Sequence, residues 1–401
     1  MQREYDVIIW GATGFTGKLV STYMAKNYGG GNLRWALAGR SESKLNEVSA
    51  NIGGNVDLLL ADASDPESLD QLVPKARVIL TTVGPYARYG SEMVAACARH
   101  GTHYCDLTGE VHWMHKMINE HQATAQASGA RIVHTCGFDS IPSDLGVYFL
   151  QREMRKRHGV PANEIKYRTK AFKGGFSGGT IDSMMAMMEA AKNDPSIMKI
   201  IADPYALNNT YRGPDGLDKN HHYFDMDFDG WVGPFVMAAI NTRVVRRSNE
   251  LLNLSYGSDF SYNEGTLTGK GPAALMGAAA VSFGTTTMNS LAAFDGSRKL
   301  MQRMLPKPGE GPSQATIETG FFEIELLAKH PTDATNNLRA SVKGDKDPGY
   351  GSTAKMLAES AVCLAQDDLQ VGGGFWTPAS AMGDALLERS PANAGVTFNL
   401  I

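Results

Sequence analysis

Three glycines at three-residue spacing, Gly11, Gly14 and Gly17, stand between the apolar run DVIIW and the helix-forming run GKLVSTYMAKNY. The first glycine permits a tight turn, the second lets the backbone approach a pyrophosphate, and the third allows close packing of helix on strand. Phosphate charge at such a turn faces the free N–H groups of a helix N-terminus. The pattern predicts a nucleotide-binding turn formed by Gly11, Ala12, Thr13, Gly14, Phe15, Thr16 and Gly17.

The end of the second apolar run, WALAGRS, indicates which nucleotide binds there. An acidic residue at this point would bind the ribose 2′-hydroxyl of NAD(H). The chain instead has Arg40 and Ser41, with Lys44 one turn later. A guanidinium and a hydroxyl suit a 2′-phosphate, so the sequence favours NADP(H) over NAD(H) as the cofactor. The alternative is that Arg40 is a solvated charge at a strand end.

Two further strand ends are expected to line the same site. Asp62 follows the third run and could accept a hydrogen bond from the adenine amino group, with Ala63 beside the ring, although Asp62 could equally form a turn. The fourth run ends at the carboxyl edge of the sheet, where a dinucleotide crosses toward its reactive ring. The residues expected there are Thr82, Val83, Gly84 and Pro85.

Hydride chemistry on a nicotinamide cofactor also needs a proton donor near the substrate. Tyr86, Asp106 and Asp139 stand in loops after three different strands, and such loops gather at one crevice. Asp139 could equally cap a helix, and Tyr86 could equally be a packing residue. These alternatives stay open, so all three are candidate catalytic residues.

The elements that must position these residues alternate regularly over the first 150 residues. Apolar runs separated by helix-forming segments predict a parallel sheet covered on both faces, which is a Rossmann-type doubly wound α/β fold. The runs are 5–10, 33–38, 56–61, 76–83, 102–107 and 130–136. We expect a dinucleotide-binding domain over 1–150.

Beyond residue 150 the alternation changes, which predicts an inserted mixed α/β domain over 151–345. It includes an antiparallel strand at TGFFEIELLAKH, a loop over 208–233, and a strand-like run TRVVRRSNE with a solvated arginine cluster. GGFSGGTIDSMMAMMEAA predicts an anion-binding turn, or a methionine-lined groove for an apolar chain, or, as the favoured interpretation, a flexible hairpin and a core helix. Two amphipathic segments within 346–401 should return to the first domain.

Composition excludes several classes of function. The net charge of -4 gives no basis for nucleic-acid binding, and the four cysteines show no metal-ligand spacing, as expected for reduced thiols in a cytoplasmic protein. His221, His222 and the aspartates after them are expected to form a surface loop rather than a metal site. The apolar run 271–284 is too short to span a bilayer, so we expect a buried or partner-facing helix there, with peripheral membrane contact as the alternative.

Seven segments together resemble the saccharopine dehydrogenase-like oxidoreductases, and the closer branch is that of the trans-acting enoyl reductases. The segments are DVIIWGATGFTGKLV, WALAGRS, VGPY followed by YG, THYCDLTGE, CGFDSIPSDLG, SGGT and DPGYGSTAKM. The resemblance implies an NADP(H)-binding Rossmann domain, with the glycine turn at Gly11, Gly14 and Gly17 and phosphate recognition by Arg40 and Ser41. It also implies a homodimer formed through the inserted domain.

Within this resemblance, the enoyl reductase branch implies reduction of a carbon–carbon double bond in a lipid intermediate, whereas saccharopine reductases act on an imine. An imine substrate with several carboxylates would need paired arginines in the second domain. The Met-, Phe- and Gly-rich middle of the chain better suits an apolar acyl or lipid-like substrate. A non-catalytic nucleotide-binding scaffold, associated with lipid, is the remaining alternative.

Overall fold

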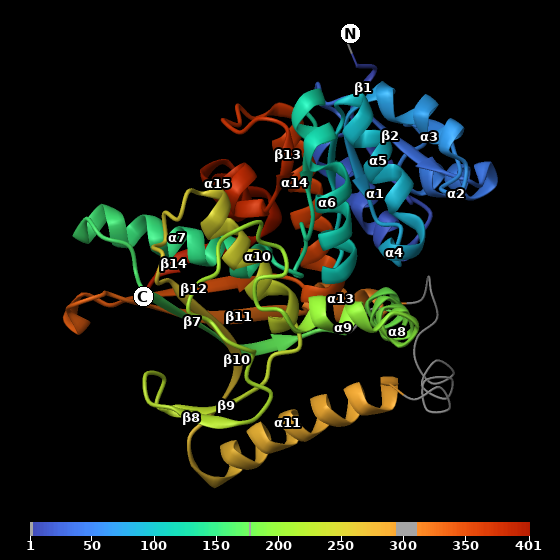
Figure 1. Ribbon diagram of the computed structural model, residues 1–401. Helices are drawn as coiled ribbons and strands as arrows, with labels where there is room; N and C mark the ends of the chain where they lie inside the picture. Colours follow the sequence, from blue (N-terminus) through green and yellow to red (C-terminus); the bar gives the residue numbers. More distant parts are fainter. Residues whose placement is uncertain (1–2, 176–177, 294–310) are drawn as a thin grey trace.

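The computed structural model describes residues 3–175, 178–293 and 311–401, so Ser177 of the SGGT motif lies outside the described residues. Two seven-stranded sheets organise the chain, and Figure 1 shows them one above the other with helices between and around them. The first sheet carries the nucleotide-binding turn. The second forms the body of the inserted domain.

All strand pairs of the first sheet are parallel, in the order β13-β6-β5-β4-β1-β2-β3. The six strands predicted from the apolar runs are present. A seventh, β13, comes from the C-terminal segment and pairs with β6 at the edge of the sheet. The strands are β1 (Tyr5–Trp10), β2 (Trp35–Gly39), β3 (Asp57–Leu60), β4 (Ala76–Thr81), β5 (His103–Cys105), β6 (Arg131–Val133) and β13 (Gly374–Trp376).

Helices connect these strands, and their ends follow the capping residues of the sequence. Asp65 accepts a hydrogen bond from the Glu67 N–H at the start of α3, while Gly101 and Gly129 take left-handed conformations after α5 and α6. The helices are α1 (Phe15–Tyr28), α2 (Glu42–Asn51), α3 (Pro66–Leu72), α4 (Tyr86–Tyr89), α5 (Ser91–His100), α6 (Val111–Ser128) and α7 (Ile141–His158).

The second sheet is mixed, in the order β14-β12-β11-β7-β10-β9-β8, with β7 and β10 parallel and the other pairs antiparallel. The antiparallel strand predicted at TGFFEIELLAKH is β11. The strands are β7 (Glu164–Lys173), β8 (Tyr223–Asp225), β9 (Gly230–Gly233), β10 (Ser261–Gly269), β11 (Phe321–Lys329), β12 (Leu338–Gly344) and β14 (Val396–Leu400).

The C-terminal segment belongs to both sheets. Its helices α14 (Thr353–Gln366) and α15 (Pro378–Arg389) pack on the first domain, α14 against α1 and α15 against α7, as predicted. Its last strand, β14, instead pairs with β12 of the second sheet, because Val396 and Phe398 bury their side chains there. The tail therefore ties the two sheets together (Figure 1).

The expectation of a strand-like, solvated arginine cluster was wrong. TRVVRRSNE lies inside α10 (Ala238–Leu251), and Arg243, Arg246 and Arg247 are 2–3% exposed. Arg243 pairs with Asp218, Arg246 pairs with Asp215 at 2.7 Å, and Arg247 donates to the carbonyls of Leu207 and Phe375. Burial also lowers the pKa of Arg247 to about 10. Each guanidinium is buried with partners, as buried charges require.

The remaining helices belong to the inserted domain and frame its cavity. They are α8 (Gly178–Asn193), α9 (Pro195–Ala202), α11 (Gly271–Ala293) and α13 (Gln314–Thr319). The predicted loop 208–233 includes the β8–β9 hairpin, so that expectation was wrong in part. Among the described residues, no cluster of His, Cys, Asp and Glu could hold a metal ion.

The apolar run 271–284 forms the first part of α11, which packs on β9 and β10. Ala274 and Ala278 are buried, but Met276 is 72% exposed and Phe283 is 75% exposed. The helix is therefore not buried within this chain. In the described part of the chain, no helix is both long and apolar enough to cross a membrane.

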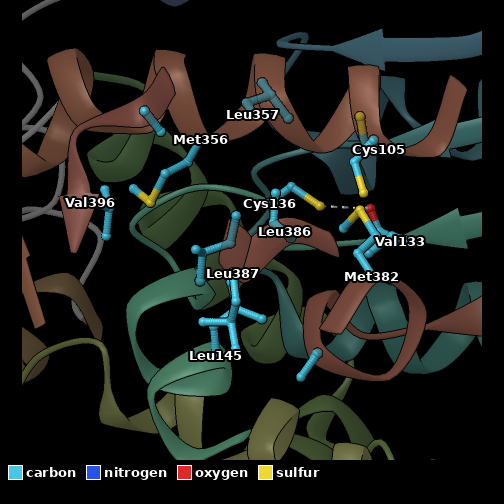
Figure 2. Close-up of a cluster of buried hydrophobic side chains, with 14 of the residues drawn as sticks. Cys105, Val133, Cys136, Leu145, Met356, Leu357, Met382, Leu386, Leu387 and Val396 are labelled. Carbon is cyan, nitrogen blue, oxygen red and sulfur yellow. Dashed lines mark hydrogen bonds between the residues drawn. The ribbon is translucent and has the colours of Figure 1, made fainter. Parts of the chain in front are cut away.

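An apolar core joins the first sheet to the C-terminal helices. Figure 2 shows Cys105 and Cys136 beside Met382, with Leu145 of α7 and Leu357 of α14 closing the cluster. The dashed contact joins the Cys136 Sγ to the Val133 carbonyl at 3.6 Å. All four cysteines are buried free thiols, as the sequence predicted.

Candidate active site

The nucleotide-binding turn needs glycine at two positions because other atoms fill the space around them. Gly11 has a φ of +85°, and a Cβ there would come 2.5 Å from the Val83 side chain. A Cβ on Gly17 would come 2.1 Å from the Gly11 carbonyl oxygen. These contacts hold α1 tightly against the end of β1, which is the packing that the sequence pattern predicted.

Gly14 plays a different part. It is the N-cap of α1, no side chain caps the helix there, and a Cβ on Gly14 would be 3.4 Å from its nearest neighbour, the Gly11 oxygen. The protein itself therefore does not exclude a side chain at this position. Gly14 leaves the first-turn N–H groups of α1 open toward the cavity, which is the arrangement that binds phosphate at helix N-termini.

A cavity of about 950 Å³ extends from this turn into the inserted domain. Its volume lies within the range of small-molecule sites. At one end it meets the predicted cofactor residues, and at the other it meets α8, α9 and the start of α10. The predicted residues that line it are Gly11, Thr13, Gly14, Phe15, Thr16, Arg40, Asp62, Ala63, Thr82, Val83, Gly84, Tyr86 and Asp139.

Other predicted cofactor residues lie outside the cavity lining. Ala12 and Gly17 are buried beneath the turn, where they shape it. Ser41 is the N-cap of α2, Lys44 is exposed in the first turn of that helix, and Pro85 is the N-cap of α4. Of the basic and hydroxyl residues predicted to recognise a 2′-phosphate, Arg40 is therefore the one that reaches the cavity.

Asp62 forms the turn that was one of its two predicted roles. Its carboxylate accepts hydrogen bonds from the Ser64 N–H at 2.9 Å and the Ser64 hydroxyl at 2.7 Å, so it forms a turn. These bonds lower the pKa of Asp62, and the nearby Arg40 charge lowers it further. Asp62 also lines the cavity. It is thus a carboxylate fixed beside Arg40 at the expected adenosine end.

Tyr86 forms part of the cavity wall, but its hydroxyl is engaged with the backbone. The hydroxyl donates to the Thr81 carbonyl at 3.2 Å and accepts from the Leu107 N–H at 3.4 Å. Burial raises the pKa of the phenol well above its ordinary value. Both contacts tie the hydroxyl to the ends of two strands, which favours the packing interpretation of Tyr86 over proton transfer.

The two aspartate candidates differ in position. Asp139 lines the cavity, and burial raises the pKa of its carboxyl to about 7. Asp106 is fully buried, does not line the cavity, and holds four hydrogen bonds from neighbouring groups. The interpretation of Asp106 as a proton donor to the substrate was therefore wrong, because its carboxylate lies behind the cavity wall.

Glu110 was not among the site residues predicted from the sequence. Its carboxylate lines the cavity and accepts bonds from the N–H groups of Tyr86 at 2.8 Å and Ala87 at 2.9 Å. It also accepts a bond from the Ser183 hydroxyl of α8 at 2.9 Å. Burial raises the pKa of Glu110, and these three donors oppose that effect. Glu110 thus connects the inserted domain to the first domain at the cavity.

The inserted domain contributes a mostly apolar wall. Met187 and Met188 of α8 line the cavity, so the methionine-rich helix does form part of a groove, contrary to the favoured interpretation of a core helix. Arg243 also lines the cavity, but its guanidinium bonds to Asp218 and to the Ile201 carbonyl. The other apolar lining residues of this domain include Met198, Ile201, Leu217, Phe235, Met237 and Ile240.

Comparison with known proteins agrees with this geometry. Residues 7–133 match the family model described as the saccharopine dehydrogenase NADP binding domain. The chain is similar to proteins named trans-acting enoyl reductase from Mycobacterium tuberculosis, 41% identical over 99% of this chain and 98% of that protein, and from Mycobacterium leprae, 40% identical over the same shares.

A solved structure shares the fold across both domains. Apo saccharopine dehydrogenase (L-Glu forming) from Saccharomyces cerevisiae aligns over 99% of each chain with a TM-score of 0.57 and 12% sequence identity. This similarity concerns the arrangement of the two sheets and the returning C-terminal helices, which is the architecture that the sequence predicted.

Proposed function

The chain belongs to the saccharopine dehydrogenase-like oxidoreductase family, on the branch of the trans-acting enoyl reductases, and we propose that it uses NADPH to reduce a carbon–carbon double bond in an acyl or lipid-like substrate. One observation carries the proposal. A single cavity joins Arg40 and the glycine turn, at one end, to Asp139 and an apolar wall, at the other.

The residues present fit the phosphates of NADP(H). Gly14 leaves the N-terminus of α1 open, and Arg40 supplies a cation where the 2′-phosphate of the adenosine half would lie. When bound, the cofactor supplies a hydride to the substrate. Thr82, Val83 and Gly84 at the end of β4 would support the nicotinamide end, as expected at the carboxyl edge of a parallel sheet.

Asp139 is the proposed proton donor. A carboxyl with a pKa of about 7 is substantially protonated at neutral pH, so it can give a proton to the carbon that does not receive the hydride. Its loop follows β6, two strands along the sheet from β4. The chain thus needs no other group to complete the addition of hydride and proton.

The apolar wall supports an acyl substrate over a polycarboxylate imine. Among the described residues that line the cavity, the inserted domain contributes two cations. Arg243 is neutralised by Asp218, and the Lys219 Nζ lies 4.3 Å from the Tyr223 ring centroid. The methionines of α8 offer adaptable packing for an alkyl chain. An imine substrate with several carboxylates would require paired cations on this wall, and of the described lining residues of the inserted domain only Lys219 is a cation without a carboxylate partner.

The test is NADPH oxidation with a panel of 2-enoyl thioesters of increasing chain length, measured beside imine and 2-oxo acid plus amine mixtures. We expect turnover with enoyl thioesters that depends on Asp139. The Asp139→Asn variant is the sharp control, since it keeps the shape of the side chain but cannot give a proton. Turnover with the imine mixtures alone would contradict the enoyl assignment, and NADPH binding without any turnover would favour the scaffold alternative.

A further inference from the structure

The Asp106 carboxylate connects two loops that reach the cavity, although it does not face the cavity itself. Its Oδ1 accepts hydrogen bonds from the N–H groups of Thr108 and Thr135, both at 3.1 Å. Its Oδ2 accepts from the Tyr104 hydroxyl at 2.8 Å and pairs with the His134 Nδ1 at 2.7 Å. All four partners are buried, so the carboxylate is fully satisfied in the interior.

The His134 ring supports this orientation. Its Nε2 is buried and has no hydrogen-bond partner among the described residues, so the imidazole proton belongs on Nδ1, where it donates to Asp106. The Tyr104 and Trp113 rings pack edge-to-face on the same imidazole, at centroid distances of 5.7 Å and 5.0 Å. Asp106 and His134 therefore form a rigid pair behind the cavity wall.

The Asp106–His134 pair contacts the backbone at Thr135. Its φ is +61°, a left-handed conformation that strains a β-branched residue and persists only where surrounding contacts hold it. Its N–H bonds to the Asp106 carboxylate, and the next N–H, of Cys136, donates to the Asp106 carbonyl at 2.7 Å. Directly after this bend, the chain runs through Gly137 and Phe138 to Asp139.

The second loop held by Asp106 leads to Glu110. The Thr108 N–H bonds to the carboxylate, and the Thr108 hydroxyl accepts from the Glu110 N–H at 3.2 Å. One buried carboxylate thus fixes the loops after β5 and β6, which carry the cavity carboxyls Glu110 and Asp139. No residue of the cavity lining makes this connection in the described part of the chain.

We propose that Asp106 is a positioning residue, which holds Thr135 in its left-handed conformation and so places the Asp139 carboxyl in the cavity. This inference rests on the proposed role of Asp139. The charge of Asp106 has a second effect at the same site: after burial, it is the neighbouring charge that raises the pKa of Asp139. Burial raises the pKa values of the Tyr86 phenol and the Cys136 thiol, and the charge of the nearby Asp139 adds to this effect.

The test separates geometry from charge with two substitutions. Asp106→Asn keeps an oxygen for the two backbone N–H groups and turns its NH2 group toward Tyr104 and His134. These two residues then become acceptors, the Tyr104 hydroxyl by rotating and the His134 Nδ1 by moving its proton to Nε2, whereas Asp106→Ala removes both sets of bonds. We expect Asp106→Ala to lower kcat by roughly ten- to a hundredfold, the effect of a misplaced catalytic group. Asp106→Asn should keep kcat within about threefold at low pH, while the descending limb of the pH profile moves to lower pH.

Glycine at position 135 provides the discriminating variant, because glycine adopts positive φ without strain. We expect Thr135→Gly alone to leave kcat near the wild-type value, and Thr135→Gly combined with Asp106→Ala to recover at least about tenfold of the lost rate. Asp144→Asn is the matched control: Asp144 is another buried aspartate that bonds to Ser248 and the Ala379 N–H, away from the cavity lining. It should leave the pH profile in place.

A readout without substrate distinguishes this inference from the proposed function. The difference in thermal stability between wild type and Asp139→Asn, followed from pH 4 to 9, reports the titration of Asp139. The same difference in the Asp106→Asn background should be displaced to lower pH. If the pH dependence of this stability difference is the same in both backgrounds, the charge of Asp106 does not raise the pKa of Asp139. This result needs no substrate turnover.

The proposal that Asp106 positions Asp139 is overturned if Asp106→Ala has the wild-type kcat. It is also overturned if Thr135→Gly does not restore the kcat that Asp106→Ala loses. If Asp106→Ala does not fold, recovery of folding in the double variant supports it. Failure of the double variant to fold, together with an Asp106→Asn variant whose kcat falls by more than tenfold, overturns it.

Discussion

The rings of Phe15 and Tyr350 meet edge to face, with their centroids 4.7 Å apart. Phe15 begins α1 directly after the glycine turn, whereas Tyr350 belongs to the C-terminal segment, and both line the cavity. The Asp347 carboxylate accepts a bond from the Tyr350 N–H at 2.7 Å and from the Gly175 N–H at 3.0 Å. The far end of the chain thus helps to build the phosphate end of the site.

This contact predicts that Tyr350 contributes to cofactor binding through its ring. Tyr350→Ala should raise the Kd for NADPH by about tenfold, because it removes the aromatic contact that holds Phe15 beside the turn. Tyr350→Phe keeps the ring and should bind within about twofold of wild type. Fluorescence titration with NADPH measures both. Equal weakening in the two variants would mean that the hydroxyl, not the ring, matters.

The glycine turn predicts opposite outcomes at two neighbouring positions. Gly17→Ala would bring a Cβ 2.1 Å from the Gly11 oxygen, so it should destabilise the fold by about 1–3 kcal/mol or more. Gly14→Ala meets only an ordinary contact at 3.4 Å, so it should fold normally and bind NADPH more weakly. Urea unfolding and NADPH titration of the two variants separate these effects. If the Gly14→Ala variant binds NADPH as tightly as wild type, the phosphates of the cofactor do not lie at this turn.

The raised pKa of Asp139 predicts a stability that depends on pH. The native carboxyl titrates at about 7, whereas an unfolded aspartate titrates near 3.9, so between these values the native state holds a proton that the unfolded state has released. Stability from this group is therefore fully present below about pH 4 and lost as the pH rises to about 7. Asp139→Asn should remove the contribution of this group to the slope, whereas Asp144 and Glu264, whose pKa values burial also raises to about 7, keep theirs. The variant should be more stable than wild type above pH 7, on the order of 1–3 kcal/mol.

The same substitution tests the role of Asp139 in turnover. We expect Asp139→Asn to lower kcat by at least about a hundredfold, the usual contribution of a general acid, with little change in the Kd for NADPH. In the wild type, kcat should decline as the pH rises through about 7, because the proton is lost. Wild-type activity in Asp139→Asn would assign the proton to water or to another group.

The hydrogen bond from the Ser183 hydroxyl to Glu110 predicts that contact between the two domains affects substrate binding. Ser183→Ala removes the bond from α8 to Glu110 but leaves the two backbone donors in place. The free energy of unfolding should change by no more than about 1 kcal/mol, and KM for substrate should rise several-fold. Ser21→Ala is a matched control, since Ser21 is a buried serine that bonds within α1 to the Gly17 carbonyl. Unchanged KM in Ser183→Ala would make the contact incidental.

Local patterns predicted the first domain well because its signals are local. The glycine turn and the apolar strands each depend on a few adjacent residues, and both are present in the structure. Arg40 was recognisable because the end of β2 has a fixed position relative to the turn. Local patterns did not predict contacts between residues that are far apart in the sequence.

The arginines of α10 illustrate that failure. Their run has apolar and polar residues that fit a strand as easily as a helix, and their burial depends on Asp215 and Asp218 in a separate loop. Asp106 was predicted as a candidate proton donor, but its four partners, from β5 and from the loops after β5 and β6, bury its carboxylate behind the cavity wall. Ser183 and Tyr350 lie in segments that the sequence singled out, but nothing local indicated their contacts with Glu110 and Phe15.

The most direct test of the account is a titration of wild type, Arg40→Ala and Lys44→Ala with NADPH and NADH. We predict that wild type binds NADPH much more tightly than NADH. Arg40→Ala should lose roughly ten- to a hundredfold of the NADPH affinity, while NADH binding is little changed. Lys44→Ala alters an exposed cation outside the cavity and should bind both nucleotides as wild type does. Equal binding of both nucleotides by wild type, or an NADPH preference that survives in Arg40→Ala, would contradict the assignment of this site to NADP(H).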